Sequence, residues 1–131
     1  MIIDYSKANM SKQDFQGADF EEAFLYDAQL DGADLTEANL QRAELAGANL
    51  RGANLTRALL MGADLTEADL TGADLTGAQL DGADLRGAVI TVYQLQVADC
   101  GEHTRIDHEL ALELHWLELD NIENKNTPTE L

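Results

Sequence analysis

The stretch GADLTEADLTGADLTGAQLDGADLRGA, residues 62–88, decides the fold because it repeats one short phrase every five residues. Each repeat reads Ala, then an acid or an amide, then Leu, then two small or polar residues. The phase continues in both directions, so that every fifth residue from Met10 to Leu95 is apolar. Ala stands two places earlier in each repeat up to residue 88, with Gln13 as the single exception. The sequence is therefore that of a repeat protein without inserted loops.

A period of five suits neither a straight α-helix nor a long strand. In a helix each step of five rotates the apolar position by roughly 140°, and in a strand the side chains alternate with period two. In a three-residue extended segment, however, Ala and Leu point the same way and the residue between them points outward. Nine of the ten glycines occupy the last repeat position, where a type II turn requires a positive φ. Short sides joined by such corners predict a coil that closes on itself.

The spacing of charged residues predicts how many sides one coil has. If each corner turns the chain by about a right angle, four sides close one coil in about 20 residues, and neighbouring coils lie roughly 4.8 Å apart. Three arginines each follow an acid by 20 residues, which would stack each pair vertically, and three threonines would form a similar column. Arg86, opposite Thr66, does not follow this rule. The stacked pairs are Glu22 with Arg42, Asp31 with Arg51 and Glu37 with Arg57, and the column is Thr36, Thr56 and Thr76.

The segment ADLTEADLTGADLTGAQL, residues 63–80, resembles the pentapeptide repeat family, whose pattern is A-(D/N)-L-X-X. This resemblance covers about residues 3–102 and implies a right-handed quadrilateral β-helix with its central Leu or Phe and its Ala directed inward. We therefore expect an all-β solenoid of about 4–5 coils with a C-terminal α-helical cap. Most members of the family have no assigned activity, and some mimic DNA and bind DNA gyrase, conferring quinolone resistance.

The C-terminal part departs from the repeat. Beyond Ala88 the outward positions become apolar, at Val89, Val92, Tyr93 and Val97, which favours a covered coil. A helix is predicted from about Thr104 to Asn121, with Thr104 as its N-cap. The expected organisation is a β-helix over residues 1–102, a capping helix over 103–121 and a flexible tail over 122–131.

The predicted helix has two apolar stripes on nearly opposite sides. One stripe would seal the open edge of the β-helix, which otherwise invites strand pairing. The second stripe either packs on the flank of the rod or forms a homodimer surface. The first stripe is Ile106, Leu110, Leu114 and Leu117, and the second is Leu112, Trp116 and Leu119.

The composition restricts the partners. The 131 residues carry a formal net charge of −17 with a pI near 4.1, which argues against direct binding to nucleic acid or to an anionic membrane. A basic protein partner or mimicry of a polyanion is compatible with this charge. A single cysteine gives no disulfide framework, and we expect neither a secretory leader nor a membrane-spanning segment. The expected location is cytoplasmic.

The sequence predicts no enzyme, no cofactor and no metal site. No Ser/His/Asp grouping, Walker loop or dinucleotide fingerprint is present, and stacked carboxylates such as Asp64 and Asp84 are interpreted as a solvated ladder. The zincin spacing would require a histidine where Leu112 stands, and His108 with His115 lack a third ligand. Cys100 falls on the inward phase and is interpreted as a small core residue.

The leading hypothesis is a non-enzymatic structural or protein-interaction module with flat acidic faces. The alternative is a DNA mimic that binds or inhibits DNA gyrase or another DNA-binding protein, because the acid density of the rod is comparable with that of duplex DNA. Ice binding is a third interpretation, which depends on the single threonine column. The candidate partner surface consists of outward apolar residues, namely Phe24, Tyr26, Leu59 and Met61 on the rod and Leu112, Trp116 and Leu119 on the helix.

Overall fold

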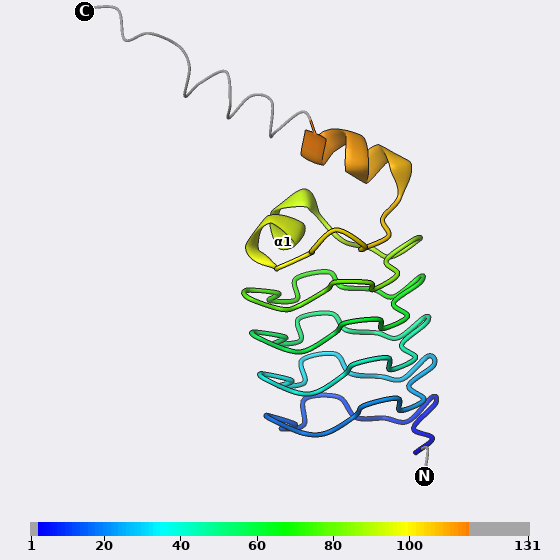
Figure 1. Ribbon diagram of the computed structural model, residues 1–131. Helices are drawn as coiled ribbons and strands as arrows, with labels where there is room; N and C mark the ends of the chain where they lie inside the picture. Colours follow the sequence, from blue (N-terminus) through cyan, green and yellow to red (C-terminus); the bar gives the residue numbers. More distant parts are fainter. Residues whose placement is uncertain (1–2, 116–131) are drawn as a thin grey trace, which may run out of the picture.

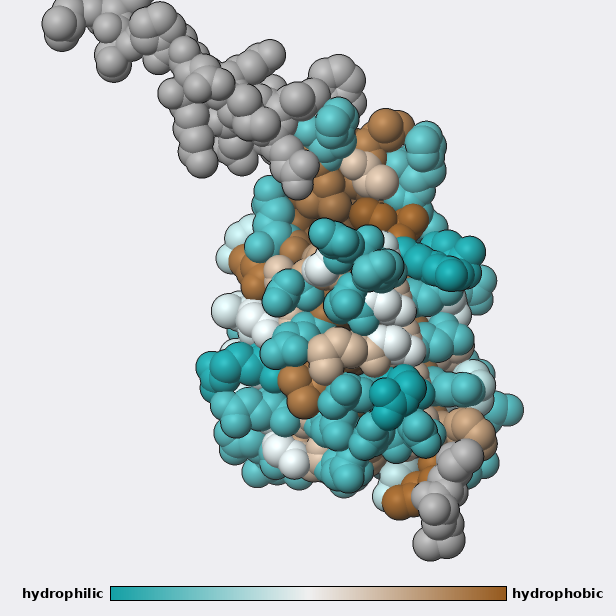
Figure 2. Space-filling model, in the orientation of Figure 1, coloured by the Kyte–Doolittle hydropathy of each residue, from teal (hydrophilic) through white to brown (hydrophobic). Residues whose placement is uncertain are grey.

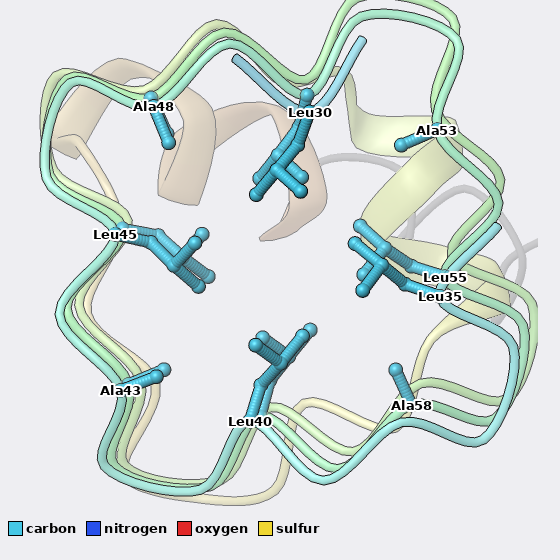
Figure 3. Close-up of a cluster of buried hydrophobic side chains, with 14 of the residues drawn as sticks. Leu30, Leu35, Leu40, Ala43, Leu45, Ala48, Ala53, Leu55 and Ala58 are labelled. Atoms are coloured by element: carbon cyan, nitrogen blue, oxygen red, sulfur yellow. The ribbon is translucent and has the colours of Figure 1, made fainter. Parts of the chain in front are cut away.

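The computed structural model describes residues 3–115, which form a stack of four-sided coils with helical segments at one end (Figure 1). The first described residues, from residue 3, lie at the opposite end of the stack. A view along the axis shows Leu30, Leu35, Leu40 and Leu45 entering the interior from four successive sides (Figure 3). The solenoid that the five-residue period predicted is the observed fold.

Adjacent coils are joined by isolated parallel bridges, and residues 3–115 contain no longer strand. The bridges link residues 20 positions apart, such as Phe24 with Glu44 and Glu44 with Asp64, except the last, between Asp84 and Arg105, which are 21 positions apart. We name the sides of a coil A to D: in the coil of residues 23–42 they are residues 23–27, 28–32, 33–37 and 38–42. A residue 20 positions further along the chain lies on the same side of the next coil.

Every corner from Lys7 to Gly87 has a positive φ at its second turn residue. Nine of these corners hold glycine, with φ between 65° and 74°, and eight hold another residue, with φ between 52° and 61°. The acid or amide of the repeat supports the corner, because its Oδ1 accepts the N–H two residues later, at 3.0 Å from Asp34 to Thr36. The repeat residues therefore specify both the inward face and the turn.

The core is a column of Leu and Ala side chains closed at the N-terminal end by larger residues. The inward leucines from Leu25 to Leu85 are at most 1% exposed, and each contributes roughly 1.5–3 kcal/mol on burial. In the first coil Phe20 contacts Phe15 edge-on, with ring centroids 5.3 Å apart, and Tyr5, with centroids 5.7 Å apart. These rings fill the end of the core.

The sequence predicted a continuous β-helix over residues 1–102. A helix interrupts the β-helix within this range. Helix α1, Val92–Val97, replaces side C of the last coil. The reason is Tyr93, which stands where other repeats have the small inward Ala and is 71% exposed on the helix. Leu95 nevertheless stays buried, and the ladder resumes at Asp99, which bridges to Gln79. The helix thus takes the place of one side without shifting the register.

Gln94 replaces the ladder hydrogen bond that α1 removes. In the coil below, the carbonyl of Ala53 accepts the backbone N–H of Asp74 at 2.9 Å. One coil higher, the carbonyl of Ala73 instead accepts the side-chain amide of Gln94 at 3.0 Å, and this amide also donates to Leu70 O at 2.7 Å. Thr91 caps α1 and forms a capping box with Gln94. The helix is therefore anchored to the coil through one buried side chain.

The second helical segment begins at residue 108, and the predicted start with Thr104 as N-cap is wrong. Thr104 donates its hydroxyl to Leu80 O at 2.8 Å, and the next residue, Arg105, still bridges to Asp84. The chain is therefore still part of the ladder at the point where the helix was expected. Asp107 immediately precedes the helical residues, and its carboxylate accepts the N–H of Gly87 at 3.0 Å.

The helical segment turns one apolar stripe towards the rod. Ile106, Leu110 and Leu114 are partly buried against the core, whereas Leu112 is 45% exposed. The described residues end at residue 115. They therefore do not include Trp116, Leu117 and Leu119 of the predicted stripes, the predicted helix end at Asn121 or the predicted tail, residues 122–131. The proposed division at residues 102 and 121 remains a prediction.

Candidate interaction surfaces

The outward charges are unevenly distributed among the four sides of the rod. Side B is balanced, with Asp31 and Asp69 against Lys12 and Arg51. Sides A and D each carry several more acids than bases, and side C carries four acids, Asp14, Asp34, Glu37 and Asp74, against one base, Arg57. The acids of side A are Asp4, Asp27, Glu44, Asp64, Glu67 and Asp84, and those of side D are Asp19, Glu21, Glu22, Asp81, Asp99 and Glu102.

Two of the three predicted vertical pairs form ion pairs. Arg42 Nε lies 3.2 Å from Glu22 Oε1, and Arg57 Nη2 lies 2.9 Å from Glu37 Oε1. The remaining arginine, Arg51, instead contacts the carboxylate of Asp69, with Nη1 and Oδ2 3.0 Å apart. Because its side chain is long and exposed, it reaches the coil above as easily as the coil below.

The other members of the predicted columns also have local partners. Asp31, which does not pair with Arg51, accepts the hydroxyl of Ser11 at 2.6 Å. Arg86 pairs within its own repeat, with Nη2 2.6 Å from Asp84 Oδ2. These contacts join side chains that are at least partly exposed, and they leave most carboxylates of sides A and D facing solvent.

Threonine hydroxyls lower the pKa of several outward carboxylates. The Thr36 hydroxyl donates to Asp34 at 2.6 Å and, together with the Thr36 N–H, lowers the pKa of that carboxyl. The same arrangement with the next threonine along the chain lowers the pKa of Asp69 and of Asp74. These hydrogen bonds favour the charged form of the carboxylates and also support the corner geometry.

The apolar residues selected from the sequence lie on different parts of the rod. Phe24 and Tyr26 lie on side A of the coil 23–42, where Tyr26 is 38% exposed and the two ring centroids are 5.9 Å apart. Leu59 and Met61 are half-buried on side D of the coil 43–62. Leu112 lies on the helical segment, and Trp116 and Leu119 are outside the described residues. The described candidates therefore form separate surfaces.

The α1 helix creates a hollow that the sequence reasoning missed. A cavity of about 550 Å³ lies between α1 and side C of the coil below, lined mainly by apolar and threonine side chains. Val89 and Tyr93 at its rim are 56% and 71% exposed. Apolar residues also gather at this end of the rod on the face shown in Figure 2. Tyr93 in an Ala position was the signal that could have predicted the hollow.

The described residues bring together no set of groups suited to catalysis. Asp74 is the one acid that lines the α1 cavity, and no His, Cys or Lys lines it. No group of three or more possible metal ligands occurs within residues 3–115. His103 Nδ1 contacts Asp81 Oδ1 at 3.2 Å on the surface. Burial raises the pKa of the Cys100 thiol, which disfavours the reactive thiolate.

The described part of the chain also has no helix of the length and apolarity needed to cross a membrane.

Comparisons with known proteins agree with this geometry. The family model described as pentapeptide repeats matches residues 25–60 and 53–91. The crystal structure of HetL from Nostoc sp. strain PCC 7120, involved in heterocyst differentiation regulation, is 43% identical with a TM-score of 0.66. The match covers 66% of this chain and 40% of HetL, so the chain spans about two fifths of that protein.

Two further solved structures are similar over more of their own length. Rfr23 from Cyanothece 51142 is 33% identical, with a TM-score of 0.57 and coverage of 72% of this chain and 60% of Rfr23. A pentapeptide repeat protein of the Arabidopsis thaliana thylakoid lumen is 30% identical, with a TM-score of 0.53 and coverage of 76% and 81%, respectively. No curated protein sequence matches the chain.

Proposed function

The chain belongs to the pentapeptide repeat family, and from this premise we propose that it is a non-enzymatic structural or protein-interaction module that binds a basic protein partner through its acidic faces. Proteins of this family are structural and interaction modules. The observation that supports the proposal most is the column of outward carboxylates on side A, where Glu44, Asp64 and Asp84 follow one another in successive coils. This column presents repeated negative charge along a line and brings no unlike groups together at one point.

The physical basis of the proposed binding is electrostatic. Carboxylates at bridged positions on side A, such as Glu44 and Asp64, recur at roughly the strand spacing of 4.8 Å. A surface with one sign of charge accelerates the approach of an oppositely charged partner and makes binding sensitive to salt. Because side B is balanced and the outward positions of side D include Asn39, Leu59 and Gln79, a basic partner is expected to meet the rod on the carboxylate column of side A.

Affinity capture from native lysate with side-specific variants tests this proposal. The test variant carries Glu44→Gln and Asp64→Asn on side A, and the matched control carries the same loss of charge as Asp34→Asn and Asp74→Asn on side C. A captured protein is then purified and titrated against each variant at two salt concentrations. We expect weaker, less salt-sensitive binding for the side A variant only. Equal binding by both variants, or a turnover reaction abolished by changing one acid, contradicts the proposal.

A homodimer through the C-terminal helix remains a proposal, supported by the 45% exposure of Leu112 on the face opposite the partly buried stripe. Light scattering of Leu112→Ser and Trp116→Ala variants tests it. A monomer mass for both variants and a dimer mass for the unmodified chain is the expected outcome. An unchanged mass in both variants contradicts a dimer through this face.

DNA mimicry remains the alternative prediction. The column of acids on side A and the excess of acids on sides C and D favour it, whereas the charge balance of side B does not resemble a duplex, which is anionic all round. The measurement is inhibition or protection of gyrase in a supercoiling assay at low and high salt. No effect at micromolar protein dismisses this alternative.

A cytoplasmic location likewise remains a prediction.

A further inference from the structure

One aromatic pair interrupts the acidic column of side A. The outward positions of this side are Asp4, Phe24, Glu44, Asp64 and Asp84 in successive coils, joined by parallel bridges. Phe24 is therefore the one aromatic residue in a column of carboxylates. The Tyr26 ring lies beside the Phe24 ring at 34°, with the centroids 5.9 Å apart, and Tyr26 is 38% exposed. The two rings form a continuous aromatic strip on the surface.

Carboxylates surround this strip. Asp4 and Glu44 are the bridge partners of Phe24 below and above, and bridged residues lie roughly 4.8 Å apart. Asp27 follows Tyr26 at the corner and is exposed. Within residues 3–115 these three carboxylates form no ion pair. Lys7 lies below Asp27 in the corner column and donates its backbone N–H to Tyr26 O at 2.8 Å, but within residues 3–115 it forms no ion pair with these carboxylates.

The second apolar pair of the rod has different surroundings. Leu59 and Met61 occupy the corresponding repeat positions on side D and are half-buried. The bridge partners of Leu59 are Asn39 and Gln79, which are neutral amides. Negative charge directly above and below the pair is therefore a property of the aromatic strip and does not follow from the repeat alone.

We propose that Phe24 and Tyr26, with the carboxylates of Asp4, Asp27 and Glu44, bind an arginine side chain of a basic peptide segment. This inference rests on the proposed function and names the chemistry of the partner. A guanidinium stacks flat on an aromatic face and donates hydrogen bonds to carboxylates from its edge at the same time. A lysine ammonium is a compact and strongly hydrated charge, which gains less from the ring faces. The aromatic strip therefore selects arginine over lysine.

Titration of the full chain with two matched peptides tests the site. The probes are N-acetyl-tetraarginine amide and N-acetyl-tetralysine amide, measured by calorimetry at 150 mM salt and by the NMR shifts of the Tyr26 ring protons. The test variant is Phe24→Asn with Tyr26→Thr, which installs the residues of the repeat that contains Asn54 and Thr56. The matched control is Leu59→Asn with Met61→Thr, which makes the same change at the other apolar pair.

We expect the unmodified chain to bind tetraarginine about five- to tenfold more tightly than tetralysine, a range set by cation–π energies of about 1 kcal/mol. The aromatic variant is expected to lose this preference, and the Leu59/Met61 control to keep it. Glu44→Gln is expected to weaken binding of both peptides, which gives a second readout if the aromatic variant folds poorly. Circular dichroism of each variant verifies its fold.

Equal affinity for the two peptides overturns the inference, as does an equal loss of preference in the Leu59/Met61 control, because either result means that the overall acidity of the rod is sufficient. A partner protein that binds the unmodified chain and the aromatic variant equally well also overturns it, while leaving the proposed function intact. Conversely, a chain that prefers tetraarginine but binds no basic protein supports this site and contradicts the proposed function.

Discussion

Arg57 lies one coil above Glu37 and forms an ion pair with it, with Nη2 and Nε at 2.9 Å and 3.0 Å from Glu37 Oε1. The two residues are 20 positions apart, so this contact shows directly how the coil converts sequence spacing into vertical neighbours. Their side chains are 61% and 57% exposed, which allows water to screen the attraction. The contact therefore reports the register of the coils more than it stabilises them.

Replacement of Arg57 separates the ion pair from the strain of its corner. Arg57 has a φ of 55°, a conformation that costs a residue with a Cβ about 1–2 kcal/mol and costs glycine little. Arg57→Ala and Arg57→Gly both remove the ion pair, but only Arg57→Gly relieves the strain. We expect Arg57→Gly to be more stable than Arg57→Ala by about 1 kcal/mol in urea unfolding. Equal stability of the two variants would mean that the corner is unstrained.

Glycine corners differ in what a Cβ would meet. At Gly52, with φ of 65°, an added Cβ meets nothing within 4 Å, so that Gly52→Ala tests backbone strain alone. At Gly101, with φ of 63°, the added Cβ lies 2.8 Å from both Cβ and Cγ of Asp81, whose carboxylate contacts His103. We expect Gly52→Ala to cost about 1–2 kcal/mol and Gly101→Ala to cost more. Thermal unfolding of the two variants provides the comparison, and the reverse order would contradict it.

Gln94 is predicted to be the polar side chain on which the attachment of α1 depends most. Gln94→Ala removes the hydrogen bonds to the carbonyls of Leu70 and Ala73; Leu70 O keeps the N–H of Ala73, but Ala73 O is left unsatisfied, which costs about 1–3 kcal/mol. Gln96→Ala is the matched control, because Gln96 is exposed on the same helix. Hydrogen exchange is expected to accelerate in α1 in the Gln94 variant only. Similar exchange in both variants would show that apolar packing alone holds the helix.

The periodic part of the fold could be predicted from the sequence because each repeat specifies the same local structure. Inward Ala and Leu, an outward acid or amide and a corner glycine all agree, and the positive φ expected at the glycines occurs at each of the nine corners. The eight corners without glycine show that stacking also imposes this conformation on residues such as Arg42 and Glu67. Local pattern and global packing thus support each other along the rod.

The irregular parts were harder to predict because single residues decide them. Tyr93 occupies an Ala position, and its size converts a side of the coil into α1, although Leu95 and Cys100 keep the apolar phase. Arg51 has two acids within reach, and spacing alone cannot choose between them. Thr104 resembles an N-cap in sequence, but its hydroxyl bonds to the coil below. The surface candidates remain proposals, because outward apolar residues indicate a contact surface but do not identify the partner that binds there.

Leu65→Asp tests how strongly neighbouring coils depend on one another. Leu65 is fully buried, so the variant places an unpaired carboxylate in the middle of the core. Because each coil is stabilised by its neighbours, the damage is expected to spread beyond one coil and to cost more than about 4 kcal/mol. Gln79→Asp introduces the same carboxylate at an exposed position and is expected to change stability by less than about 0.5 kcal/mol. Urea unfolding of both variants measures the difference.

Acid is expected to destabilise the rod through the carboxylates bonded to threonine. The pKa of Asp34 is lowered first by the Thr36 hydroxyl and then by the Thr36 N–H, and the pKa values of Asp69 and Asp74 are lowered in the same way, with Arg51 adding to the effect at Asp69. A pKa lowered in the folded state contributes stability that is present above the unfolded value of about 3.9 and is lost as the pH falls through the folded value. The melting temperature should therefore fall as the pH drops below about 4.

The triple variant Asp34→Asn, Asp69→Asn, Asp74→Asn is expected to reduce this acid sensitivity while keeping the fold. Asn54 already shows that an amide serves at this position, because its Oδ1 accepts the Thr56 hydroxyl at 2.6 Å and the Thr56 N–H at 3.0 Å. An amide does not titrate, so the part of the acid sensitivity that comes from these carboxyls disappears.

A matched control separates this effect from the general loss of negative charge. Glu67→Gln, Glu102→Gln and Glu109→Gln remove the same number of charges at exposed positions that have no hydrogen bond to a threonine among residues 3–115. Melting temperatures at pH 7 and at pH 2.5 are compared for the unmodified chain and both triple variants. We expect the smallest fall in the aspartate variant and a larger fall in the glutamate control. Because both variants carry the same net charge, equal falls would assign the acid sensitivity to charge repulsion and contradict a role for the threonine-bonded corners.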